Sequence, residues 1–121
     1  MQMPESLQSK SLAKLTLNDL VFLILLKAQE KNHWLTFQHI QSKIHQVYSA
    51  NGFSEGYIRK NKFYDSTSIS AAIRALRNIN NRCKYNLPED MSIEVVDKRK
   101  KLNSKAIEYK LINIGVNYGK Q

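Results

Sequence analysis

A cluster of cationic side chains near the C-terminus is the part of this sequence with the clearest chemistry. Residues 98–105 read Lys-Arg-Lys-Lys-Leu-Asn-Ser-Lys and contain five positive charges and no negative charge. Ammonium and guanidinium groups at this density bind phosphate oxygens through charge-assisted hydrogen bonds. The flanking stretches alternate like β-strands, which predicts a phosphate-contacting loop at the tip of a hairpin. A plainer role for such lysines is to block pairing of edge strands between molecules. The candidate contacts are Lys98, Arg99, Lys100, Lys101 and Lys105.

Polar side chains also gather on one face of a helix expected over residues 66–82. From Ile69 onward, apolar residues recur at i, i+3, i+4, i+7 and i+10, which predicts a buried helical face, and no acidic residue occurs between Ser66 and Pro88. On the opposite face Arg can bond guanine bidentately and Asn can bond adenine. The first turn offers amides to a phosphate. A solvated surface is the plainer interpretation. The polar face comprises Ser66, Thr67, Ser70, Arg74, Arg77, Asn78 and Asn81, of which Arg74 and Asn78 are the best candidates for direct readout.

A third cationic group lies in the less regular segment 53–65, between two expected helices. Arg59, Lys60 and Lys62 occur there among aromatic residues. Aromatic rings can stack on the bases of a single strand, but beside helix caps we expect them to pack in the core or in an interface. The segment is expected to hold either a short helix of its own or another contact with nucleic acid. Its aromatic residues near the basic group are Tyr57, Phe63 and Tyr64.

Helix caps and periodicity indicate the elements that must position these side chains. Thr16 begins the first helix in a capping-box pattern with an aspartate three residues later, and the helix is expected over Leu17–Gln29. Thr36 is the expected cap of a second helix, which Asn51-Gly52 ends in a left-handed turn. The first of these helices is apolar on nearly every side, so we expect it to be central.

The residue types and their spacing give little support for a catalytic function. His33, His39 and His45 are not spaced as metal ligands on a helix, and no carboxylate lies at a spacing that would complete a site with them. The sequence has neither a phosphate-binding glycine loop nor a nucleophile elbow. The single cysteine, Cys83, excludes a disulfide within the chain. We therefore expect a protein that is not an enzyme and that holds neither a cofactor nor a metal.

Charge points to an anionic partner. The chain of 121 residues has a net charge of +9 and a pI near 9.7. Residues 1–55 hold five lysines and four acidic residues, whereas residues 56–121 hold fourteen cationic and six acidic residues, so the excess belongs to the second half. The longest apolar run, Leu20 to Leu26, is too short to span a bilayer, and no signal peptide is recognisable. We expect a soluble, cytoplasmic, nucleoid-associated protein.

Short strands expected at 34–35, 92–97 and 106–114 complete an order of helix, strand, helix, helix, strand, strand. This order, with the placement of charge, resembles the winged helix-turn-helix superfamily from Thr16 to Ile114. The resemblance implies an α+β fold with three main helices, a short strand and a C-terminal two-stranded β-hairpin wing.

In such a fold, the helix over 66–82 is the recognition helix and the loop over 98–105 is the wing. The implied organisation is a flexible arm (1–15), a domain (16–114) and a tail (115–121). One departure is the connector at 53–65, which is much longer than the three or four residues of an ordinary helix-turn-helix.

The function implied is sequence-specific binding of double-stranded DNA, by a small transcriptional regulator that acts as a homodimer. The apolar first helix and the N-terminal arm are the expected dimer contacts. One alternative is a replication, partition or recombination accessory factor of a mobile element. Another is a winged-helix protein-interaction module whose basic surface meets an acidic partner. RNA is a further alternative without a specific aromatic signature. No membrane contact is expected.

Overall fold

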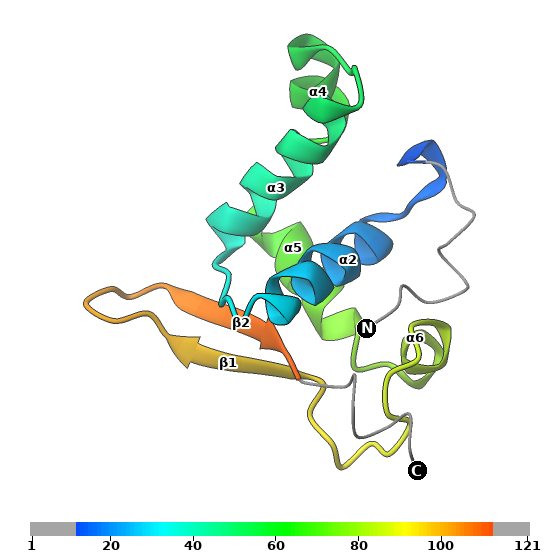
Figure 1. Cartoon of the computed structure of the whole chain (residues 1–121), viewed down its shortest axis with the longest axis vertical. Helices are drawn as coiled ribbons and strands as arrows, with labels where there is room; N and C mark the ends of the chain where they lie inside the picture. The colour runs from blue at the N-terminus through cyan, green and yellow to red at the C-terminus, as the bar shows by residue number, and fades with distance from the viewer. Residues whose placement is uncertain (1–11, 113–121) are drawn as a thin grey trace.

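The helices come first along the chain and a β-hairpin follows them (Figure 1). The computed structural model describes residues 12–112, apart from the side chain of Ala13, and these residues form an α+β fold. The expected arm and tail lie outside this range, except for residues 12–15. The elements are η1 (Leu12–Lys14), α2 (Leu17–Glu30), α3 (Phe37–Ala50), α4 (Glu55–Asn61), α5 (Ser66–Ala75), α6 (Ile79–Lys84), β1 (Val96–Lys100) and β2 (Ile107–Leu111).

Helix α2 is the centre of the core, as its apolar circumference predicts. The Thr16 hydroxyl accepts a hydrogen bond from the amide of Asp19, and the Asp19 carboxylate accepts one from the amide of Thr16, each over 3.1 Å. This reciprocal pair confirms the expected capping box. Helices α3 and α5 and strand β2 all pack against α2. Leu12 and Leu15, in the expected arm, also pack partly against the core, so the structured part begins earlier than predicted.

Helix α3 begins and ends where the sequence predicts. Thr36 caps it, and the Nδ1 atom of His39 accepts a hydrogen bond from the Thr36 amide over 3.2 Å, so a histidine completes this second capping box. Ile40, Ile44 and Tyr48 form its buried stripe. The chain then leaves the helix through Gly52, whose φ of +87° lies in the left-handed region that glycine adopts without strain.

The connector at 53–65 contains a short helix, α4, which Ser54 caps and Ile58 anchors in the core. Its aromatic residues differ in how far they are buried. Tyr64 is half-buried against the core, whereas Tyr57 is 42% exposed and Phe63 is 67% exposed. The prediction that these rings pack in the core or in an interface is therefore confirmed for Tyr64, whereas for Tyr57 and Phe63 the interface stays a prediction.

The single helix expected over residues 66–82 is two helices. Helix α5 ends at Ala75, and the chain turns through residues 76–78 before α6 begins. Asn78 caps α6, with its side-chain oxygen accepting a hydrogen bond from the amide of Asn80 over 2.8 Å. The side-chain amide of Asn81 donates from Nδ2 to the carbonyl of Ala75 over 2.7 Å. Asparagine side chains thus satisfy the backbone groups that the break exposes. Because of these bonds, the chain forms two helices although its apolar residues have the spacing of a single one.

The hairpin also differs from its prediction. Strand β1 begins at Val96 instead of residue 92, and it includes residues 98–100, which the sequence assigns to the loop. Val96 pairs with Leu111 and Lys100 pairs with Ile107, in antiparallel register. The short strand expected at 34–35 is reduced to one bridge, in which the amides of Leu35 and Tyr109 each donate to the other's carbonyl.

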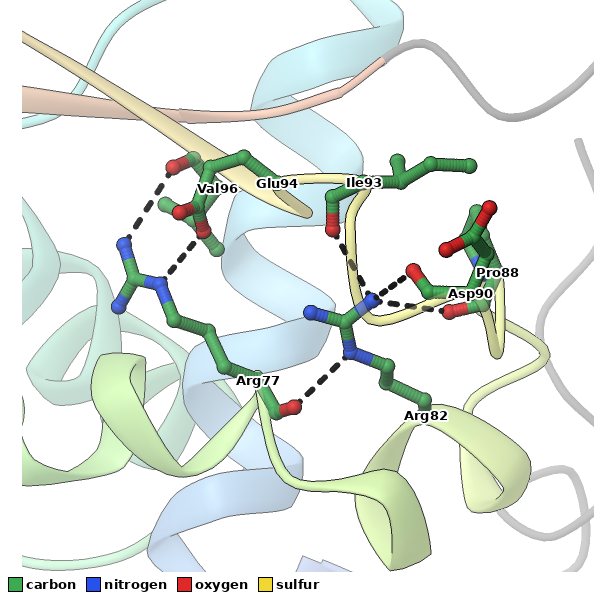
Figure 2. Close-up of polar contacts among 7 residues, drawn as sticks. All are labelled: Arg77, Arg82, Pro88, Asp90, Ile93, Glu94 and Val96. Atoms are coloured by element: carbon green, nitrogen blue, oxygen red, sulfur yellow. Dashed lines mark hydrogen bonds and ion pairs between the residues drawn. The ribbon is translucent and has the colours of Figure 1, made fainter.

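A buried arginine explains the late start of β1 (Figure 2). Arg82 is 2% exposed and its guanidinium donates to the carbonyls of Pro88, Asp90 and Ile93 over 3.2, 2.8 and 3.0 Å. These carbonyls are turned towards α6 and are not available to a strand ladder. The segment before β1 is therefore an ordered turn instead of a strand.

None of the helices within residues 12–112 has the length and apolarity that crossing a membrane requires.

Candidate nucleic-acid interface

Helix α5 carries four of the polar residues predicted to read bases: Ser66, Thr67, Ser70 and Arg74. Its opposite face is buried through Ile69, Ala72 and Ile73, so the burial pattern directs the polar face outward. Arg74 is exposed, and its Nη1 atom donates to the Ser70 hydroxyl over 2.7 Å. This contact, one helical turn apart, holds the guanidinium along the outer face of α5.

The first turn of α5 is less suited to a phosphate than the sequence indicates. Asp65 caps the helix, and its carboxylate accepts a hydrogen bond from the amide of Ser68 over 2.8 Å. This backbone bond, with a smaller contribution from the Ser68 side chain, lowers the pKa of Asp65. A negative charge therefore already occupies the position at which an incoming phosphate would bind.

Three other predicted residues of this group make contacts within the chain. Arg77 donates from Nε to a Glu94 carboxylate oxygen over 2.5 Å and from Nη2 to the carbonyl of Val96 over 3.5 Å (Figure 2). Asn78 and Asn81 serve the break between α5 and α6, as described above. These three side chains hold the hairpin and α6 in place against α5, and they do not continue the exposed face of that helix.

The cations of β1 point to both faces of the hairpin. Lys98 and Lys100 are opposite Tyr109 and Ile107 and lie on one face, because directly paired residues of an antiparallel ladder share a side. Arg99 lies on the other face, opposite Glu108.

Arg99 is held in place by two side chains, those of Glu108 and Trp34. Its Nε atom donates to Glu108 over 3.1 Å, and its guanidinium carbon lies 4.2 Å from the centre of the Trp34 ring. The Lys110 ammonium also lies 5.7 Å from that ring, and it bonds the side-chain oxygen of Asn32. Guanidinium stacked on indole with a carboxylate at its edge is a stable arrangement. Arg99 is therefore engaged, unlike the lysines that flank it.

The hairpin tip at 101–106 is ordered by its own backbone. The amide of Lys101 donates to the carbonyl of Ala106 over 2.9 Å, and the amide of Ser104 donates back to the carbonyl of Lys101 over 3.2 Å. Asn103 has a φ of +60°, a conformation that asparagine tolerates. Lys98, Lys100, Lys101 and Lys105 are all exposed, and within residues 12–112 none of them forms an ion pair.

The basic group of the connector lies apart from the hairpin, at the far end of α3 (Figure 1). Arg59 forms an exposed ion pair with Glu55 over 2.9 Å, and Lys62 lies 5.2 Å from the centre of the Tyr48 ring. Lys60 is exposed. The structure thus places one predicted basic group just before α5 in the chain and the other on the hairpin, without bringing the two together.

Two residues that the sequence reasoning missed belong to this region. Trp34 supports Arg99 and Lys110, and only the folded chain brings these three together. Leu102 is 86% exposed at the hairpin tip. An apolar residue between lysines in a turn is a recognisable signal, because such a side chain has no core to enter.

The histidines have ordinary local roles where the structure shows a contact. His39 completes the cap of α3, and the Nε2 atom of His45 lies 2.7 Å from a carboxylate oxygen of Glu55. Over residues 12–112, no cluster of three or more His, Cys, Asp or Glu side chains is arranged to hold a metal ion.

A scan against protein-family models, a search of curated proteins and a search of solved structures each find no match to this chain. Geometry and charge are therefore the basis for a functional assignment.

Proposed function

We propose that this chain is a winged-helix protein that binds double-stranded DNA in a sequence-specific manner. The support for the fold is the element order, with α2, a bridge at Leu35, α3, α5 and then the hairpin, and the pairing of Leu35 with the outer edge of β2. The observation that carries the binding proposal is the hairpin, whose exposed lysines have no ion-pair partner in the described chain. Four unpaired cations on one projection suit a polyanion.

In this proposal α5 enters the major groove and Arg74 is the principal residue that reads a base. Its exposed guanidinium can bond the O6 and N7 atoms of guanine bidentately, at about 1 to 3 kcal/mol of discrimination. The hydroxyl of Ser70, already bonded to Arg74, restricts the rotamers of that guanidinium. Thr67, one turn earlier and exposed, can contact a neighbouring base or phosphate.

The hairpin then contacts the sugar-phosphate backbone beside the groove that α5 occupies. Lys98 and Lys100 would contact phosphates from one face of β1, while Lys101 and Lys105 would do so from the tip. Leu102 is proposed to make an apolar contact in the minor groove, where exposed apolar side chains of architectural proteins wedge between base steps. Arg99 is assigned to stability instead, because Trp34 and Glu108 already hold it.

The biological role proposed is a small transcriptional regulator, whose specificity comes from two copies on a repeated half-site. A single module buries roughly 600 to 1,000 Å² on DNA, and pairing half-sites adds the missing specificity. A factor for replication, partition or recombination would use the same contacts, and the position of its sites beside an origin would distinguish it.

The experiment that tests the proposal is selection of bound duplexes from genomic fragments at about physiological salt. We expect a few enriched sites that share a repeated half-site. Retention without sequence preference would contradict specific readout, and failure to retain any duplex would favour a protein-interaction module.

A matched pair of variants separates the hairpin from overall charge. Replacing Lys100, Lys101 and Lys105 with glutamine removes the same charge as replacing Lys27 on α2, Lys31 directly after α2 and Lys43 on α3. Only the first set is expected to abolish enrichment. Equal loss in both would mean that net charge, and not the hairpin, retains the DNA.

A further inference from the structure

An apolar groove runs along α2, on the part of the molecule that α2 and α3 form. Its volume is about 560 Å³, and its walls come from η1, α2, the segment after α2 and the C-terminal half of α3. Its floor is apolar, and it includes the half-buried side chains of Leu12, Leu15, Leu23 and Val47. No residue of α4, α5, α6 or the hairpin lines it.

Both long walls of the groove are helical stripes. On α2 and its C-cap residue Lys31, the lining residues fall at i, i+3, i+4, i+7, i+8 and i+11, starting at Leu20. On α3 they fall at i, i+3, i+4 and i+7, starting at Lys43 and ending at Ala50. At 1.5 Å of rise per residue the α2 stripe is about 16 Å long, which is about three helical turns. The groove is therefore elongated, with the dimensions of a helix face.

The rim of the groove is cationic. Lys27, Lys31, Lys43 and His33 are the lining residues that can carry charge, and the lining contains no acidic residue. All three lysines are exposed, and none of them forms an ion pair within residues 12–112. An apolar floor between basic edges is complementary to a ligand that is apolar on one side and acidic along its margins.

We propose that this groove is a docking site for an acidic amphipathic helix of a partner protein. A helix of about three turns, with apolar side chains at i, i+3 or i+4 and i+7, would place these side chains on the floor in the helix-in-groove mode of recognition. Aspartate or glutamate residues beside the apolar stripe would then reach Lys27, Lys31 and Lys43. Apolar contact supplies affinity, and the basic rim selects against neutral and basic helices.

A second copy of this chain is a poor occupant, because it would bring a net charge of +9 to a cationic rim. Its ten acidic residues are also outnumbered by nineteen cationic ones. Because the groove shares no element with α5 or the hairpin, a partner helix and a DNA duplex can bind at the same time. The docking proposal does not depend on DNA binding.

The test is a selection from a displayed library of 16-residue peptides, with the full chain as bait. The double variant Lys27→Glu/Lys43→Glu is the counter-bait. A matched control, Lys98→Glu/Lys100→Glu, makes the same change in charge on the hairpin. A third variant, Leu23→Asp, changes the floor of the groove. All three variants are checked for folding by circular dichroism before use.

We expect enriched peptides with an apolar stripe at helical spacing and acidic residues beside it. A synthetic peptide of that sequence should bind the rim variant about tenfold more weakly than wild type, a loss of about 1.4 kcal/mol, and should bind the hairpin control as tightly as wild type. Leu23→Asp, which puts a charge on the floor, should also abolish binding. Peptide binding should survive the hairpin variants that abolish DNA retention, so the two proposals can fail separately.

Three outcomes would overturn the proposal. The first is enrichment of acidic peptides without apolar periodicity, since those would bind by charge alone. The second is that the rim variant enriches the same peptides as wild type, or that wild type enriches no peptide more strongly than the rim variant does. The third is a dimer in sedimentation that Leu23→Asp dissociates, because the groove would then be occupied by a second copy of this chain.

Discussion

Tyr85 donates a hydrogen bond from its phenolic hydroxyl to the buried carboxylate of Asp19 over 2.6 Å, and so joins the end of α6 to the first turn of α2. The Tyr85 ring also stacks on Phe22, with ring centres 4.4 Å apart. The Lys84 ammonium lies 2.9 Å from the same carboxylate. Burial raises the pKa of Asp19, but the bonds from Tyr85, Lys84 and Thr16 together outweigh it and hold the pKa at about 2. Burial and the Asp19 charge raise the pKa of Tyr85.

Asp19→Asn is expected to destabilise the protein by about 2 kcal/mol at pH 7. The folded pKa of about 2 lies below the unfolded value of 3.8, so the ionised carboxylate stabilises the folded state above pH 3.8. This contribution is lost as pH falls through about 2, and the difference between wild type and variant should shrink with it. Urea unfolding at pH 7, 4, 3 and 2 measures this, with the exposed Asp97→Asn as control. A difference that is constant with pH would show that the charge of Asp19 is not what stabilises the fold.

Arg82→Lys is expected to cost about 2 to 4 kcal/mol of stability, although it keeps the charge. Arg82 donates to four carbonyls, those of Arg77, Pro88, Asp90 and Ile93, in a planar geometry that an ammonium cannot reproduce (Figure 2). Thermal and urea unfolding measure the loss. The exposed Arg74→Lys provides the control and should change stability by less than about 0.5 kcal/mol. Equal stability of the two variants would mean that the guanidinium geometry of Arg82 contributes little.

Arg74→Ala is expected to relax sequence preference at one position of the bound site. Loss of a bidentate contact should reduce the discrimination there by about 1 to 3 kcal/mol and leave binding to unrelated duplexes nearly unchanged. Competition binding with duplexes substituted at each position in turn measures this. If the variant instead weakens binding to every duplex equally, Arg74 contacts phosphate and the base contacts lie elsewhere.

Lys100→Ala and Arg99→Ala are expected to differ, although the residues are adjacent. Lys100 is exposed, so its removal should weaken binding to all duplexes and reduce the salt dependence of log K by about one unit. Arg99 is held by Trp34 and Glu108, so its removal should lower stability and change the salt dependence less. Binding titrations over a range of salt, with urea unfolding of each variant, separate the two effects. The same reduction in salt dependence for both would place Arg99 on DNA.

Local signals predicted the elements that have local causes. The capping box at Thr16, the cap at Thr36 and the left-handed Gly52 depend on residues within a few positions, and the bounds of α2 and α3 follow from them. The break after α5 was recognisable in principle, because Asn78 is a better cap than a helix-interior residue. Its apolar neighbour Ile79 continued the helical spacing and concealed the signal.

Contacts between distant segments could not be predicted in the same way. The late start of β1 depends on Arg82, whose partners lie in the turn that follows α6. The contact that holds the Arg99 guanidinium depends on Trp34, which lies far earlier in the sequence. The residue types of the candidate site, and the two main segments that carry them, could thus be predicted from the sequence. The division between cations that are exposed and cations that support the fold required the tertiary structure.

The contacts of Arg82 also indicate how this sequence can change over evolution. Arg82 binds carbonyl oxygens of the backbone, and every amino acid carries the same carbonyl. Residues 88–93 of the turn between α6 and β1 can therefore accept many side chains, and Met91 among them is already 58% exposed. Position 82 itself should accept almost none. Variation in related sequences is expected to concentrate in the turn, next to one invariant arginine.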